Sequence, residues 1–107
     1  MSVGVRTRRF SVAEYRKMVP AGILKESDRV ELIEGEIVEM VPIGPRHAVC
    51  VDRLSQALQR RLADRVIVRT QGPVSLGPYS EPQPDLALFR PPVARYAESH
   101  PGPDDLF

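Results

Sequence analysis

Cysteine is almost absent from this chain, which has only Cys50 among its 107 residues. A single thiol excludes an intrachain disulfide framework and a cysteine-based zinc site, and we expect Cys50 to pack as a small buried hydrophobe. The sequence also lacks any apolar stretch of the length that crosses a bilayer, and its first residues lack the apolar core of a signal peptide. These absences predict a cytoplasmic protein that does not enter a membrane.

The chain also has no large excess of positive or negative charge. Lys and Arg total 15 against 14 Asp and Glu, so the formal net charge is +1. A balance this even gives no global attraction to a polyanion, and any contact with nucleic acid must come from a local patch. Lysine is scarce, with only Lys17 and Lys25. We interpret the excess of arginine as compositional, although arginine also suits bidentate contacts with phosphate.

The residues that are present suffice for one small domain. Hydrophobic residues make up 42% and charged residues 27%, which is typical of a globular chain. We therefore expect a single domain over residues 1–107, with a flexible tail over residues 1–9. Its Arg6, Arg8 and Arg9 could instead contact phosphate. Most of the 11 prolines lie in the last third, where they predict short strands and loops rather than long helices.

The first elements have clear local signals. Ser11 followed by Glu14 fits a capping box, which predicts a short helix as far as about Met18 with Val12 and Tyr15 facing inward. This helix precedes the strongest strand pattern of the chain.

Residues 29–40 contain two runs rich in β-formers around Glu34 and Gly35. A two-residue turn there predicts a tight hairpin, because glycine accepts the positive φ that such turns need. In that register Glu31 lies opposite Val38, among aliphatic neighbours. A slip of one residue would turn Glu31 to solvent instead.

Residues 46–63 show the periodicity of a helix. The positions that recur at spacings of three and four, and that we expect on one inward face, are His47, Val51, Leu54, Leu58 and Leu62.

Short strands are predicted after this helix. One extends from Val66 to Val68 or as far as Gln71, a second covers residues 74–76, and a third covers residues 86–89. Residues 94–98 are expected to form a helical turn.

Asp85 is the main functional candidate, because it lies at the start of the third of these apolar runs and directly after Pro84. A carboxylate on a core strand is costly to bury unless a cation, a metal or a strong hydrogen-bond donor accompanies it. The alternative is an aspartate that caps a turn through its own backbone amides.

In their order and spacing these residues resemble the Uma-two family of restriction endonucleases, which is similar to the PD-(D/E)XK nuclease superfamily. The resemblance extends from about Phe10 to Phe89. The residues that carry it are Tyr15, residues 29–36, Met40 with Pro42, His47, and Pro84 with Asp85.

The resemblance implies an α/β (α+β) fold in which a long helix flanks a mixed sheet. It also implies a metal-dependent phosphodiesterase site that hydrolyses DNA, with Asp85 as the first acid of the motif and a direct ligand of Mg²⁺ (or Mn²⁺). The family pattern continues with a strand that bears a second acid, and this sequence ends first. We therefore expect an N-terminal part of an endonuclease-like domain, inactive alone, because one carboxylate holds Mg²⁺ poorly.

Two further residues are site candidates. Glu31 is either an acid that helps to place metal or water, or an exposed cross-strand partner of an arginine. His47 begins the long helix and could orient a phosphate or a water, or it could be a half-buried histidine bonded to the backbone.

The leading hypothesis is therefore a metal-dependent DNA endonuclease with Asp85, Glu31 and His47 in its catalytic site. The alternative is a non-catalytic nucleic-acid-binding or assembly module that keeps the nuclease scaffold. A third interpretation is a structural fragment with unpaired strand edges and exposed apolar surface. An isolated sheet edge is also compatible with a homodimer.

Overall fold

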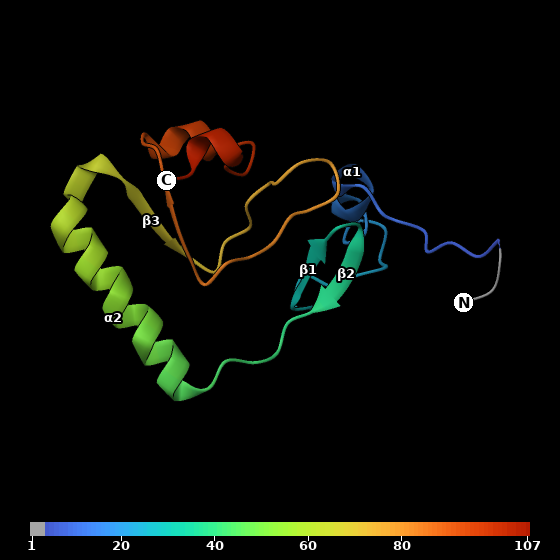
Figure 1. The fold of residues 1–107 in the computed structure, drawn as a ribbon, viewed down its shortest axis with the longest axis horizontal. Coiled ribbons are helices and arrows are strands. Elements are labelled where there is room, and N and C mark those ends of the chain that lie inside the picture. The colour runs from blue at the N-terminus through green and yellow to red at the C-terminus, as the bar shows by residue number, and fades with distance from the viewer. Residues whose placement is uncertain (1–3) are drawn as a thin grey trace.

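The fold is of the α+β class, as expected. A computed structural model describes residues 4–107 (Figure 1). The helices and strands, in chain order, are α1 (Val12–Arg16), β1 (Val30–Ile33), β2 (Glu36–Glu39), α2 (Pro45–Leu62), β3 (Ile67–Thr70) and β4 (Leu86–Phe89). Three 3₁₀ turns complete the set: η1 (Ala63–Arg65), η2 (Val93–Tyr96) and η3 (Pro103–Asp105).

The capping box that was predicted for α1 is confirmed. The Glu14 amide donates to Ser11 Oγ at 3.1 Å, and the Ser11 amide donates to Glu14 Oε1 at 3.0 Å. Val12 is buried at the start of the helix, and Met18 is buried in the turn that follows it. α1 therefore starts where predicted and stops at Arg16, slightly earlier than expected.

The hairpin and its register are also confirmed. β1 pairs with β2 in antiparallel fashion, with Glu31 opposite Val38. The turn residues Glu34 and Gly35 both have positive φ, 51° and 83°. Gly35 is required for a second reason, because a Cβ at this position would lie 2.6 Å from the Arg9 Cβ.

The expected tail over residues 1–9 falls partly outside the described residues, which begin at residue 4. Arg9 is held against the hairpin, because its Nε donates to the Glu34 carbonyl at 3.2 Å and its guanidinium carbon lies 4.0 Å from the Tyr79 ring centroid. The Phe10 amide donates to the Gly35 carbonyl at 3.0 Å. Arg8 Nη2 also lies 3.5 Å from Glu14 Oε2, so the chain contacts the folded body from Arg8 onward.

Helix α2 has the predicted extent, but not every residue that was expected to face inward does so. It packs against β3, with Val51 and Ser55 buried and Leu58 half-buried. Leu54 was expected on this face and is 49% exposed. The prediction was wrong for Leu54, because adjacent residues of a helix point about 100° apart and Leu54 therefore points away from the side on which Ser55 is buried. Cys50 is exposed too, so its predicted burial is also wrong.

The strands β3 and β4 form a second antiparallel pair, in which Ile67 lies opposite Phe89. Phe89 is fully buried, and its ring and the Tyr96 ring form a T-shaped pair with a centroid distance of 4.8 Å. The helical turn expected near Tyr96 is the 3₁₀ turn η2.

The predicted strand at residues 74–76 is absent from the part of the chain that the structure describes. The amides of Val74, Ser75 and Leu76 donate to the carbonyls of Pro82, Pro101 and Ser80. Ser80 and Pro82 belong to one segment and Pro101 to another, so residues 74–76 are hydrogen-bonded on both sides without being a named strand.

The connection between β3 and β4, residues 71–85, links the two sheets. It leaves β3, reaches the hairpin and returns, as the gold and orange segment of Figure 1 shows. At its far end Glu81 forms an antiparallel bridge with Leu32 of β1, with N–O distances of 2.8 and 3.4 Å. Leu32 is fully buried at this junction.

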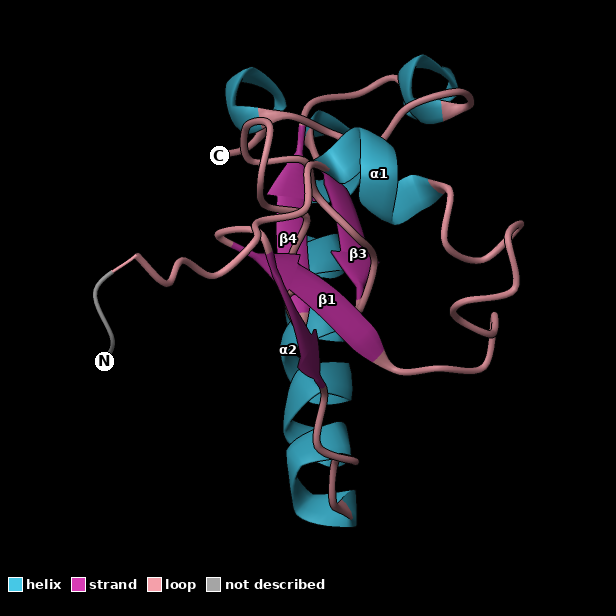
Figure 2. Ribbon diagram, turned by 90° about the vertical axis from the view of Figure 1, so that its right-hand side faces the viewer, coloured by secondary structure: helices cyan, strands magenta, loops and turns pink. Residues whose placement is uncertain are grey.

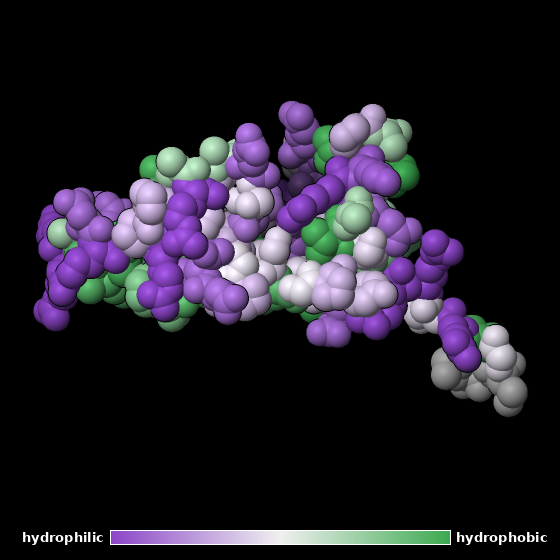
Figure 3. Space-filling view, turned by 90° about the horizontal axis from the view of Figure 1, so that it is seen from above, coloured by the Kyte–Doolittle hydropathy of each residue, from purple (hydrophilic) through white to green (hydrophobic). Residues whose placement is uncertain are grey.

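The first turns of α2 project beyond the strands in both ribbon views (Figures 1 and 2). Hydrophilic and apolar surface alternate along the face seen in Figure 3. Few apolar side chains are buried among the described residues: Val12, Met18, Leu32, Val51, Val74, Phe89 and Pro101.

Candidate functional site

Asp85 and His47 meet where the chain enters β4 and where α2 begins. His47 Nε2 lies 2.8 Å from Asp85 Oδ2, although the two residues are 38 positions apart in the sequence. Their side chains are 48% and 46% exposed, so water screens the pair and Asp85 is not a buried ion. In the described residues Asp85 makes no side-chain hydrogen bond with its own segment, so its partner is His47 rather than a turn.

This pair lies in a cleft of about 430 Å³ between the hairpin, the loop before α2 and the segment before β4. Glu31 of β1 lines the same cleft, as does Arg29. The three residues that the sequence singled out therefore line one cavity. The polar and charged side chains around it are Arg29, Glu31, Glu39, His47, Gln83 and Asp85.

Glu31 is engaged with backbone rather than with an arginine. Its Oε2 accepts a hydrogen bond from the Gln83 amide at 2.8 Å, and the Gln83 side chain in turn donates to the Val30 carbonyl at 3.4 Å. No arginine pairs with Glu31 in residues 4–107. Glu31 thus fixes the backbone two residues before Asp85, a contact across 52 positions that no local pattern indicates.

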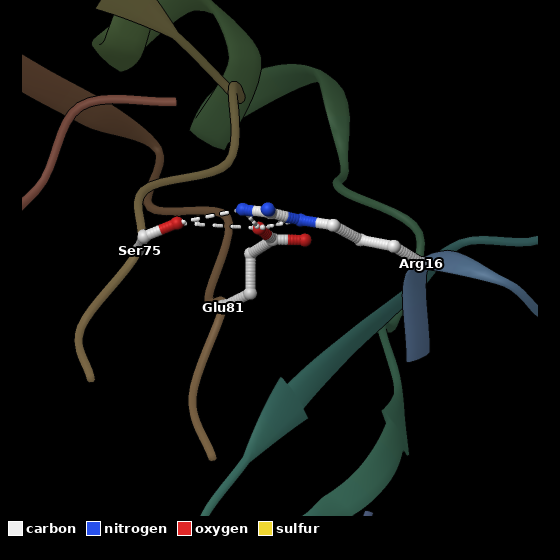
Figure 4. A network of polar contacts seen from close by, with 3 residues as sticks. All are labelled: Arg16, Ser75 and Glu81. Carbon is white, nitrogen blue, oxygen red and sulfur yellow. Dashed lines mark hydrogen bonds and ion pairs between the residues drawn. The ribbon is translucent and has the colours of Figure 1, made fainter. Parts of the chain in front are cut away.

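A second anchor of the same segment was missed at the sequence level. Glu81 is 5% exposed, and its Oε1 accepts from Arg16 Nη2 at 2.7 Å and from Arg16 Nε at 3.1 Å (Figure 4). The Ser75 hydroxyl donates to the same oxygen at 3.3 Å. This network ties α1 to the segment that leads to Asp85. The only sign of this network in the sequence is that Glu81 precedes a proline, and an acid before a proline is too common a pattern to interpret.

Tyr15 borders this network. Burial, and after it the negative charges of Glu81 and Glu31, raises the pKa of the Tyr15 hydroxyl above its ordinary value. The hydroxyl therefore keeps its proton at neutral pH and donates to the Val30 carbonyl at 3.3 Å. The sequence assigned Tyr15 to the core. Its side chain is half-buried, and its hydroxyl also makes a hydrogen bond.

The family comparison covers all of these elements. A profile described as "Putative restriction endonuclease", that of Uma2, matches residues 12–106. The chain belongs to the Uma2 family. No curated protein and no solved structure matches it significantly. The resemblance inferred from the order of the hairpin, the His-led helix and the Pro-Asp strand is thereby confirmed, and the family description is that of an endonuclease.

Within the described part of this Uma2 chain, no helix is long and apolar enough to cross a membrane.

The oxygen atoms in the cleft suit a metal ion that takes few ligands from the protein. No three His, Cys, Asp or Glu side chains in residues 4–107 converge to hold an ion. Mg²⁺, however, is commonly bound through one or two carboxylates together with waters and substrate phosphates. Asp85 Oδ1 and the second oxygen of Glu31 are such donors in one cleft. The chain thus offers a partial set of oxygen ligands, not a complete protein cage.

Proposed function

We propose that this Uma2 chain serves in the metal-dependent hydrolysis of DNA phosphodiester bonds, with Asp85 as the protein ligand for Mg²⁺ (or Mn²⁺). The observation that carries the proposal is the 2.8 Å contact between Asp85 and His47 in a cleft that also contains the Glu31 carboxylate. A cytoplasmic location is proposed with it, because the chain has a single cysteine and its substrate is DNA.

The metal, when bound, would neutralise charge on the scissile phosphate and lower the pKa of a bound water. In the hydrolysis the water oxygen forms a bond to phosphorus and the bond to the bridging ester oxygen breaks. The water gives up one proton and the leaving oxygen takes up one, so the protons balance. Asp85 lines the cleft, and His47 holds its Oδ2, which leaves Oδ1 without a hydrogen-bond partner in residues 4–107. This hydrogen bond limits rotation of the carboxylate.

Glu31 acts as a positioning residue in this proposal. It holds the Gln83 amide and thereby sets where the next residues of the segment leave the hairpin. Arg29 lines the cleft beside it and supplies the positive charge that a phosphate requires.

The test is cleavage of a supercoiled plasmid with Mg²⁺ or Mn²⁺ by the complete protein and by its Asp85→Asn variant. We expect the substitution to abolish metal-dependent cleavage while the circular dichroism spectrum is unchanged. Asp52→Asn is the matched control, because Asp52 is an exposed aspartate of α2 outside the cleft. Equal cleavage by Asp85→Asn and the wild type would rule the assignment out.

A second candidate is a non-catalytic DNA-binding or assembly module on the same scaffold. The observation that favours it is the absence of a three-ligand cluster from residues 4–107. It predicts that the wild type binds the plasmid without cutting it in either metal, and that Asp85→Asn binds with unchanged affinity.

A further inference from the structure

Helix α2 carries a row of arginines on the side that faces away from β3. Arg46, Arg53 and Arg60 are spaced seven residues apart, and all three are exposed. Seven residues are close to two turns, so the three side chains leave the same side of the helix about 10.5 Å apart. The buried residues Val51 and Ser55 lie on the opposite side.

None of these three guanidinium groups forms an ion pair or a side-chain hydrogen bond within residues 4–107. Other arginines are engaged: Arg16 binds Glu81, and Arg95 binds Asp105. The charges of the α2 row are therefore available to a partner.

The composition of α2 is unlike that of an ordinary solvated helix. Such helices usually place acids three or four residues from their cations. The positions that flank the row within α2 at these spacings are instead uncharged: Val49, Cys50, Gln56 and Ala57. The helix has four arginines and one aspartate, whereas the rest of the chain has 11 cations against 13 acids. Positive charge is thus concentrated on one element of a nearly neutral protein.

The surface between the arginines is shallow and apolar. A groove of about 750 Å³ runs along α2, and its floor is formed by Val49, Cys50, Leu54 and Ala57. Apolar side chains can contact the thymine methyl group in the major groove of DNA. An α-helix with its side chains is about 10–12 Å wide, which matches the major groove. The first turns of α2 project beyond the strands, so this end of the helix is accessible (Figures 1 and 2).

We propose that this outward face of α2 binds the phosphate backbone of duplex DNA through Arg46, Arg53 and Arg60. The inference rests on the proposed substrate class and adds the surface that holds it. The row begins at Arg46, next to His47, whose imidazole contacts Asp85. The N-terminal end of the row is therefore adjacent in sequence to a residue that lines the Asp85 cleft.

The test is equilibrium binding of a 20-base-pair duplex across a range of NaCl concentrations. EDTA is present so that no cleavage occurs. Each neutralised phosphate contributes about −0.9 to the slope of log K against log[salt]. Arg46→Gln, Arg53→Gln and Arg60→Gln should each make the slope less negative by about 0.9, with weaker binding to every sequence. Arg95→Gln is the control and should leave the slope unchanged, because Arg95 is already paired with Asp105.

Two results would overturn the proposal: no measurable binding of the duplex by the wild type at low salt, or a wild-type slope in the triple variant. A second copy of the chain is the competing occupant of this face. If sedimentation shows a dimer that Leu54→Glu dissociates while the arginine variants bind DNA normally, the face is a dimer interface. Failure of the nuclease proposal would look different. If the arginine variants reduce the slope but the wild type cleaves no DNA, the DNA-binding surface is supported and the nuclease proposal is rejected.

Discussion

Single polar contacts decide where Asp85 lies. Glu81 bridges to Leu32 through its backbone, and the Gln83 amide is held by Glu31. Two alternate residues before Asp85, Glu81 and Gln83, are therefore bonded to β1, although their segment is not a strand of that sheet. An aspartate at the end of a free loop would have to be ordered when substrate binds, at the cost of conformational entropy. Here the ordering is part of the fold.

The Arg16–Glu81 pair should be worth more than an exposed pair, because Glu81 is buried. Arg16→Met leaves the Glu81 carboxylate with only the Ser75 hydroxyl as a side-chain partner. We expect it to lower the free energy of unfolding by about 1–3 kcal/mol in urea titrations. Arg8→Met is the matched control, since the Arg8–Glu14 pair is exposed and its loss should destabilise the protein less. Equal losses in the two variants would mean that Glu81 is not the buried partner.

Glu14 should make the stability depend on pH. Hydrogen bonds from Ser11, and after them Arg8, hold the pKa of the Glu14 carboxyl below its ordinary value of 4.5. A group with a depressed pKa contributes stability that is fully present above the ordinary value and is lost as the pH falls through the depressed one. The difference in Tm between the wild type and Glu14→Gln should therefore shrink from about pH 6 to about pH 3. A constant difference would contradict the capping box.

At the scale of the elements, the sequence predicted what local chemistry determines. The cap of α1, the hairpin with its register and the extent of α2 each follow from residues within one turn or one pair of strands. The errors came where a partner from elsewhere in the chain decided the outcome. Leu54 fits the helical period yet lies off the face that β3 covers. Residues 74–76 bond to two segments, one at 80–82 and one at Pro101, instead of one strand.

The two sides of α2 should respond differently to truncation. Val51 is 8% exposed and packs on the side of β3, whereas Leu54 is 49% exposed. Val51→Ala should cost about 1–3 kcal/mol of unfolding free energy through lost burial and a cavity. Leu54→Ala should cost less than about 0.5 kcal/mol, although it removes a larger group. Urea unfolding of both variants checks this, and a greater loss for Leu54→Ala would show that its face is covered in solution.

At the scale of the whole molecule, the sequence predicted which residues share the cleft but not how they are held. Asp85, Glu31 and His47 were selected by resemblance and by type, and they do line one cavity. The Glu81 network and the link from Glu31 to Gln83 could not be found this way. Both join residues more than 50 positions apart, and such contacts depend on the path of the 71–85 segment.

The molecule is elongated for its length. Its extents are 54 × 32 × 28 Å and the Cα radius of gyration is 16.2 Å. A compact chain of this size would have about 13 Å. The two sheets lie apart and are joined through the 71–85 segment, which accounts for the small number of buried side chains. Small-angle X-ray scattering of the monomer should give a radius near the larger value. A radius near the smaller one would mean that the two sheets close onto each other in solution.

The 71–85 segment also determines where foreign sequence can be accommodated. A connection of this length would ordinarily be the first choice for a tag or a circular permutation site. Its tip, however, is bonded on both sides: the Val12 amide donates to the Pro78 carbonyl and the Gly35 amide to the Tyr79 carbonyl, each at 2.7 Å. An inserted epitope there would detach both the start of α1 and the hairpin turn. The stretch around Ile23, which is 70% exposed, is the better place to label this protein.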